Sequence, residues 1–112
     1  MTIEDIQHFL SEAKSLIRIG KWEFVRRKKN LDSLTSLNIT VPQAKAALLT
    51  LTYREYDRGP SPDNDRSGEV WEFITQLDSA EIYIKLKIDC RGCVCLSFHE
   101  SAGPKTLPYK NM

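Results

Sequence analysis

The hydrophobic period of this 112-residue chain changes partway along it, and that change constrains the fold more than any other feature. Up to Leu51, apolar residues recur at three- and four-residue spacing, which is the period of a helix. From Val70 onward, apolar and polar residues alternate, which is the period of a half-buried strand. Helices followed by strands predict an α+β domain in which N-terminal helices pack on an antiparallel sheet. The length predicts one domain covering residues 1–112.

Three helices are predicted in the first half of the chain. The first covers an apolar stripe over residues 3–17, and the third begins at Thr40. Each of these two opens with a threonine and has a capping-box partner three positions later. The second helix has leucines three apart and ends at Asn38, which is suited to a left-handed cap. Before it, residues 22–27 (WEFVRR) alternate apolar and polar residues, as a short strand does.

A polar segment and a β-meander make up the second half. Residues 53–68 contain glycine and proline but no apolar period, so a long surface loop is predicted there. Three alternating segments follow, and each predicts one strand: residues 70–75 (VWEFIT), 82–89 (IYIKLKID) and 94–101 (VCLSFHES). The last two are joined by a tight turn at Arg91-Gly92.

Alternation sorts the side chains of these strands onto two faces of the sheet. The core face is predicted to carry Trp71, Phe73, Ile82, Ile84, Leu86, Ile88, Val94, Leu96 and Phe98. The opposite face is predicted to carry Glu72, Tyr83, Lys85, Lys87, Ser97 and His99. Arg58, from the polar segment, is available to the same surface.

These polar groups match the needs of RNA cleavage without a metal. That reaction takes a proton from a 2′-hydroxyl, stabilises a charged phosphorane, and returns a proton to the departing 5′-oxygen. Glu72 and His99 are candidates for base and acid, in either order. Lys85 and Arg58 are candidates to neutralise phosphoryl charge, and Tyr83 to donate a hydrogen bond or stack on a base. Judged from alternation alone, an ordinary solvent-exposed sheet face explains the same residues.

The charge distribution permits a polyanionic partner. The net charge is only +1, but seven basic residues against one acid lie between Lys14 and Lys29. The densest part of this run is Arg26, Arg27, Lys28 and Lys29. This run is an RNA-contacting segment or, equally, a solvated connection between a strand and a helix.

Three cysteines, Cys90, Cys93 and Cys95, lie within six residues of one another. An odd, clustered count is typical of reduced cytosolic thiols rather than of a disulfide framework. Alternation places Cys93 and Cys95 on the face of His99, but a structural zinc site needs four ligands. His8 and His99 are not at the spacing of a zinc knuckle. We therefore expect thiols that behave as small hydrophobic groups, with no metal and no other cofactor.

Nothing in the sequence predicts membrane association. No apolar run approaches the roughly 20 residues that span a bilayer. The first residues, MTIEDIQ, are acidic and amphipathic, unlike the basic and then apolar start of a signal peptide. We therefore expect a cytoplasmic protein.

One long stretch carries a resemblance to a known family. Residues 52–73 (TYREYDRGPSPDNDRSGEVWEF), followed by IYIKLKI and CLSFHES, resemble the MqsR family of bacterial toxin–antitoxin modules, within the broader RelE-like group. Residues 10–21 (LSEAKSLIRIGK) are similar to the opening helix of that family. The similarity spans residues 9–101, which is most of the chain.

The resemblance implies a RelE/MqsR-like fold and an endoribonuclease that cuts messenger RNA and arrests growth. It also implies a cognate antitoxin, of the kind that can carry a zinc-finger or helix-turn-helix part that binds DNA. The implied catalytic residues are Arg58, Glu72, Tyr83, Lys85 and His99. The best-known family member has Lys, Gln and Lys in place of Arg58, Glu72 and His99.

Two alternative functions stay open at this point. The first is a non-catalytic RNA- or protein-binding module of the same fold, such as a regulator or a degenerate toxin. The second is an ordinary α+β interaction domain.

Overall fold

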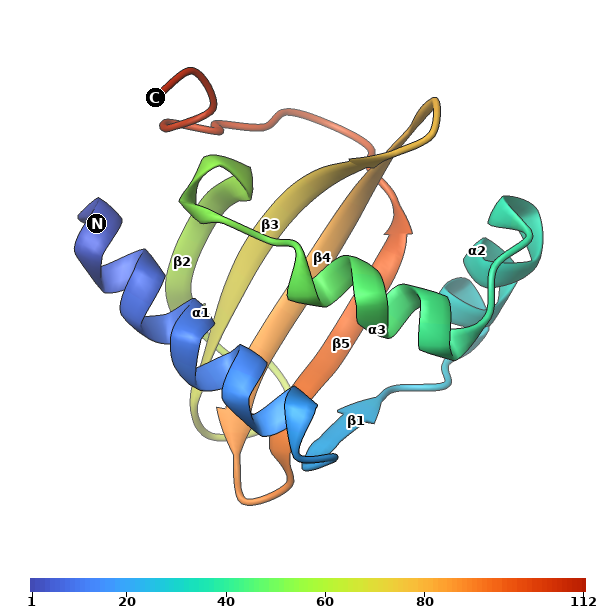
Figure 1. The fold of residues 1–112 in the computed structure, drawn as a ribbon, viewed down its shortest axis with the longest axis horizontal. Coiled ribbons are helices and arrows are strands. Elements are labelled where there is room, and N and C mark those ends of the chain that lie inside the picture. The colour runs from blue at the N-terminus through green and yellow to red at the C-terminus, as the bar shows by residue number, and fades with distance from the viewer.

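The structure is a computed structural model that describes residues 1–112, with helices packed against a five-stranded sheet (Figure 1). In chain order, the elements are α1 (Ile3–Arg18), β1 (Trp22–Phe24), α2 (Lys28–Leu37), α3 (Val41–Leu49), a 3₁₀ turn η1 (Tyr53–Glu55), β2 (Tyr56–Pro62), β3 (Glu69–Leu77), β4 (Ala80–Asp89) and β5 (Gly92–Glu100). The strand order is β1-β5-β4-β3-β2. Only β1 runs parallel to its neighbour. The predicted α+β class, with helices first and a mainly antiparallel sheet second, is confirmed.

The helix ends form as the local sequence predicts. In the capping box before α1, the Thr2 hydroxyl accepts from the Asp5 amide at 3.1 Å. Thr40 and Gln43 form the same arrangement before α3. Asn38 ends α2 in the left-handed region, at φ 56°. These ends depend on residues three or four apart, so the sequence alone was enough to predict them.

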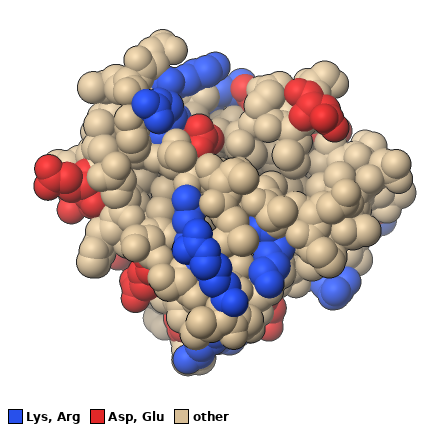
Figure 2. Space-filling view, in the orientation of Figure 1, with Lys and Arg blue, Asp and Glu red and all other residues tan.

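The helix-covered side of the molecule has a mixed surface. Lysine, arginine and acidic side chains lie scattered among uncharged residues on this side (Figure 2). None of the helices is both long enough and apolar enough to cross a bilayer.

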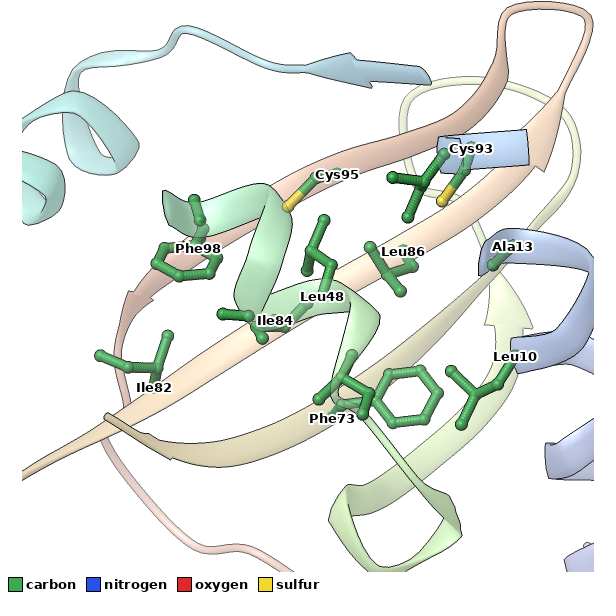
Figure 3. Packing of buried hydrophobic residues seen from close by; sticks show 14 of the residues in the cluster. Leu10, Ala13, Leu48, Phe73, Ile82, Ile84, Leu86, Cys93, Cys95 and Phe98 are labelled. Atoms are coloured by element: carbon green, nitrogen blue, oxygen red, sulfur yellow. The ribbon is translucent and has the colours of Figure 1, made fainter. Parts of the chain in front are cut away.

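The core lies between the sheet and the helices α1 and α3 (Figure 3). It is a cluster of 19 buried residues, in which α1 places the spaced apolar residues Ile6, Phe9, Leu10, Ala13 and Ile17. Phe9 stacks on Trp71, with ring centroids 4.4 Å apart. Trp22 also packs against the cluster, so both tryptophans are partly buried against the core.

The prediction of a surface loop over residues 53–68 is wrong for most of that segment. Residues 56–62 form β2, an edge strand paired with β3, and only residues 63–68 connect the two. The pairing has register shifts around Arg58, so no period-two pattern marks the strand in the sequence. At Gly59 (φ +115°), a Cβ atom would lie 2.7 Å from the Val70 carbonyl oxygen, so glycine permits the close approach of the strands.

Two further strand predictions need correction. The strand predicted over residues 22–27 covers only 22–24, because the chain turns toward α2 after Val25. In β5, Cys95 pairs with Leu86 while Ser97 pairs with Lys85, so Leu96 is the extra residue of a β-bulge.

The bulge moves side chains between the faces of β5. Cys93 and Cys95 join Phe98 in the core cluster, whereas Val94 and Leu96, predicted in the core, lie on the opposite side. The two thiols are therefore not on the face of His99, as alternation had placed them. Burial raises the pKa of the Cys93 thiol to about 12, so it stays protonated in the core.

Candidate functional site

A row of polar side chains crosses the sheet on the face away from the helices. Arg58 of β2 lies beside Glu72 of β3, Glu72 lies beside Lys85 of β4, and Lys85 lies beside Ser97 of β5. Directly paired residues point to the same side of a sheet, so these four share one face. The five residues predicted as a catalytic group therefore lie close together, because Tyr83 pairs with His99 on this same face.

A pocket of about 310 Å³ gathers four of the five predicted catalytic residues. They are Arg58, Glu72, Tyr83 and His99. Lys29 of α2 also lines this pocket, and Ser101, Ala102 and Pro104 of the C-terminal tail form one wall. Lys85 instead lines a neighbouring hollow of about 500 Å³, which reaches Glu72 from the other side. Glu72 therefore stands at the boundary between the catalytic pocket and the larger hollow.

Tyr83 and Glu72 form the central hydrogen bond of the pocket. The Tyr83 hydroxyl donates to Glu72 Oε1 at 2.6 Å. Burial, together with the hydrogen bond to Glu72 and its charge, raises the pKa of Tyr83. The phenol consequently keeps its proton at neutral pH and acts as a hydrogen-bond donor.

His99 is held as a neutral ring with a defined tautomer. Its Nδ1 lies 3.1 Å from the Glu100 carbonyl oxygen, which can only accept, so Nδ1 carries the proton and Nε2 the lone pair. Burial lowers the pKa of His99, and the positive charges of Lys29, Arg27 and Lys85 lower it further, against the opposing hydrogen bond to Glu100. A neutral imidazole with a free lone pair is suited to accept a proton near pH 7.

Arg58 is positioned by Asp57, a residue that sequence reasoning missed. Arg58 donates from Nε to Asp57 Oδ2 at 3.2 Å and from Nη2 to the Pro104 carbonyl oxygen at 3.2 Å. The buried Asp57 carboxylate also accepts from the amides of Thr106 and Leu107, at 2.6 and 3.1 Å. These contacts join β2 to the tail that walls the pocket. They connect residues 46 to 50 positions apart, so no local pattern marks them.

The pKa of Asp57 reflects the same contacts. Burial by itself raises the pKa of this carboxyl group. The hydrogen bonds from Thr106 and Leu107, with the charge of Arg58, outweigh that effect, and the net pKa is below its ordinary value. Asp57 is therefore ionised, as its role in holding Arg58 requires.

The basic run at residues 26–29 divides between the site and solvent. Arg27 donates from Nη2 to the Ser97 hydroxyl and lines the larger hollow, and Lys29 lines the catalytic pocket. Lys28 pairs with Asp32 in solvent at 2.6 Å, and Arg26 is exposed and lines neither space. Two of the four predicted RNA-contacting residues thus lie at the site.

Lys87 is on the face where alternation places it, but it is not a surface residue. Only 1% of its side chain is exposed. Its ammonium donates to Asp63 Oδ2 at 2.7 Å and to the Ser67 carbonyl oxygen at 2.9 Å. The hydrogen bond from Lys87 lowers the pKa of Asp63 to about 2. Lys87 therefore fixes the β2–β3 connection, which forms a wall of the larger hollow.

The side chains gathered here are a neutral base, a phenol, a carboxylate and several cations. No three His, Cys, Asp or Glu side chains are placed together so as to hold a metal ion. Cations beside a neutral base suit an anionic phosphodiester substrate better than an uncharged substrate.

No known family model, curated protein or solved structure matches this chain.

Proposed function

We propose that this protein is an endoribonuclease toxin of the MqsR type, with a RelE-like fold. It cleaves messenger RNA by metal-independent acid–base chemistry, acts in the cytoplasm, and is inhibited by a cognate antitoxin. The observation that carries the proposal is the pocket in which neutral His99 lies with the Glu72–Tyr83 hydrogen bond, Arg58 and Lys29. The sequence resemblance supports the same function and the same residues.

In this mechanism, His99 is the base. Its Nε2 takes the proton of a 2′-hydroxyl, and that oxygen attacks the adjacent phosphorus. The bond from phosphorus to the 5′-oxygen then breaks, which leaves a 2′,3′-cyclic phosphate and a 5′-hydroxyl. The departing 5′-oxygen is more basic than a phenolate and takes the Tyr83 proton. Transfer of the proton from the His99 imidazolium to the Tyr83 oxygen, through water, restores the starting state.

The other pocket residues position and stabilise the reacting groups. Glu72 holds the Tyr83 hydroxyl through the 2.6 Å hydrogen bond and releases it when the phosphate enters. Arg58 and Lys29 supply the positive charge for the phosphoryl oxygens, where negative charge builds in the transition state. Preorganised charge of this kind commonly contributes about 10²- to 10³-fold per group.

A cleavage assay on purified protein tests the proposal. We expect cleavage of single-stranded RNA in excess EDTA, with 2′,3′-cyclic phosphate and 5′-hydroxyl ends. His99→Ala should lose about 10²- to 10⁴-fold in rate, as is common for the loss of a general base. Lys28→Gln, a change in the solvent-facing part of the basic run, should cut normally. Activity that disappears on chelation and returns with magnesium contradicts the mechanism.

The same assay distinguishes the proposed ribonuclease from the main alternative function. A non-catalytic RNA-binding module is favoured by the cations Arg27, Lys29, Arg58 and Lys85, which serve binding without any chemistry. Salt-dependent RNA binding without any cleavage, in a protein that causes no growth arrest when induced, identifies that alternative. The proposed antitoxin is tested by searching the genome for a small neighbouring gene and asking whether its co-expression rescues arrested cells.

A further inference from the structure

The larger hollow on the site face has a composition that the catalytic proposal does not use. Its volume is about 500 Å³, and it shares Glu72 with the catalytic pocket. Three apolar side chains, Val25, Val70 and Leu96, lie in it among charged and polar ones. Apolar groups inside a charged hollow suit a ligand that is itself flat and apolar in one part and anionic in another, as a nucleotide is.

The apolar floor of the hollow is a built feature of the fold. The β5 bulge places Leu96 outside the core, beside Val25 where the chain leaves β1. Asn30 is fully buried, and its Nδ2 donates to the carbonyl oxygens of both residues, at 2.8 Å for Val25 and 3.0 Å for Leu96. Its Oδ1 accepts from the Phe98 amide at 3.0 Å. One buried side chain thus holds the two floor segments together.

Two cations stand between the floor and the catalytic pocket. Arg27 and Lys85 both line the hollow, and both lie beside Ser97. Neither belongs to any ion pair in the structure, whereas Arg91, which also lines the hollow, is paired with Asp89 and Glu23. A cation that is in no ion pair is available to bind a phosphate.

The spacing along β4 matches consecutive positions of one nucleic-acid strand. Tyr83 of the catalytic pocket and Lys85 of the hollow are two residues apart, which is roughly 6.8 Å along a strand. That is close to the separation of successive phosphates in an extended single strand. A strand with its scissile phosphate at Tyr83 therefore brings a neighbouring phosphate to Lys85.

The β2–β3 connection supplies hydrogen-bond acceptors at the edge of the hollow. Asn64 and Asp65 line it, and the Asp65 amide donates to Asp63 Oδ1 at 3.0 Å. Asp63 is itself fixed by the buried Lys87. The carboxylate of Asp65 can only accept, so it favours a base that presents N–H donors along its edge.

We propose that this hollow binds the nucleotide next to the scissile phosphate and sets the sequence preference of cleavage. The base lies over Val25 and Leu96, its N–H groups face Asp65, and its phosphate lies between Arg27 and Lys85. The inference rests on the proposed ribonuclease function, because it assigns the neighbouring position of the same substrate.

The test maps the ends produced from a random-sequence RNA by wild type, Leu96→Ser and Asp65→Ala. Wild type should show a base preference at one position beside the cut. Both variants should flatten that preference and lose about tenfold in kcat/KM on the preferred sequence, as expected for the loss of one apolar contact at Leu96 or of one hydrogen bond at Asp65. Cleavage of other sequences should continue. Leu31→Ser, at an exposed leucine outside the hollow, is the matched control and should change neither quantity.

The outcomes distinguish this inference from the proposed function. Wild-type cleavage with an unchanged preference and kcat/KM in Leu96→Ser and Asp65→Ala overturns the inference and leaves the ribonuclease proposal standing. If wild type does not cut RNA, the ribonuclease proposal fails, and fluorescence anisotropy with labelled single-stranded RNA decides the binding question. In that case the assignment to a scissile phosphate fails with the ribonuclease proposal: a base preference in binding that both variants lose assigns the hollow to nucleotide binding alone, and equal binding of all sequences by all variants excludes that role as well.

Discussion

Lys85 and Lys87 are the same residue type on the same strand and the same face, yet the structure predicts opposite consequences for replacing each. Lys87 is 1% exposed, and its ammonium makes charge-assisted hydrogen bonds to Asp63 and to the Ser67 carbonyl oxygen. A hydrogen bond to a charged group contributes about 1.5–3 kcal/mol. Lys87→Met removes both bonds, and the methionine recovers part of the loss by packing. We expect the free energy of unfolding to fall by about 3 kcal/mol, with a Tm at least about 10 °C lower.

Lys85→Met is the matched control for this experiment. Lys85 has no ion-pair partner, so its replacement should change stability by no more than about 0.5 kcal/mol. The same change should weaken RNA binding and reduce the slope of log affinity against log salt by about one, because one phosphate contact is lost. Urea unfolding followed by tryptophan fluorescence measures the first effect, and anisotropy across a salt series measures the second. If Lys87→Met unfolds at the wild-type urea concentration, the buried Lys87 contacts do not hold the β2–β3 connection as argued.

Three further predictions follow from the site. Burial and neighbouring cations lower the pKa of His99, so the apparent pKa on the acid side of the pH profile of kcat/KM should lie below the ordinary histidine value of about 6.5. Lys29→Gln should raise that apparent pKa. An apparent pKa above about 6.5 that Lys29→Gln leaves unchanged contradicts this prediction. The folded-state pKa of Asp57 is lowered, so its contribution to stability is fully present above the ordinary carboxyl pKa of 3.8 and is lost as the pH falls through the lower folded-state pKa. Asp57→Asn should cost about 2 kcal/mol at pH 7 and remove this part of the acid dependence, as thermal melts between pH 2 and 7 will show. Replacing Arg27 and Lys29 together by Gln should flatten the salt dependence of RNA binding, whereas Lys28→Gln should leave it unchanged. Equal slopes of log affinity against log salt in all variants would show that residues 26–29 face solvent and do not contact RNA.

Prediction from sequence succeeded where the controlling contacts are local. The capping boxes and the left-handed Asn38 follow from residues three or four apart. Period-two alternation placed Glu72, Tyr83 and Lys85 on one face, because β3 and β4 pair without an irregularity. It failed for Cys93, Cys95 and Leu96, where one extra residue in β5 reverses the pattern. A bulge depends on the partner strand, which the sequence of β5 alone does not contain.

The strand β2 was also missed because its structure depends on the partner strand. Gly59, two prolines and the register shifts around Arg58 conceal the strand in the sequence, and its pairing with β3 is what places Arg58 beside Glu72. The segment was predicted as a loop because edge strands tolerate residues that a central strand excludes. Arg58 was nevertheless named as a candidate, and what the sequence lacked was the register that positions it.

The sequence by itself determined the class of fold, the core stripe of α1 and the polar character of one sheet face, because each follows from periodicity within a single element. Only the tertiary structure decided which polar residues share a pocket and which are buried. Asp57 holds the C-terminal tail and Arg58, Asn30 joins β1 to β5, and Lys87 lies beneath the β2–β3 connection. The contacts of Asp57 with the tail, of Asn30 with β5 and of Lys87 with the connection join residues 20 to 68 positions apart, and their energies depend on burial that exists only once the sheet has formed.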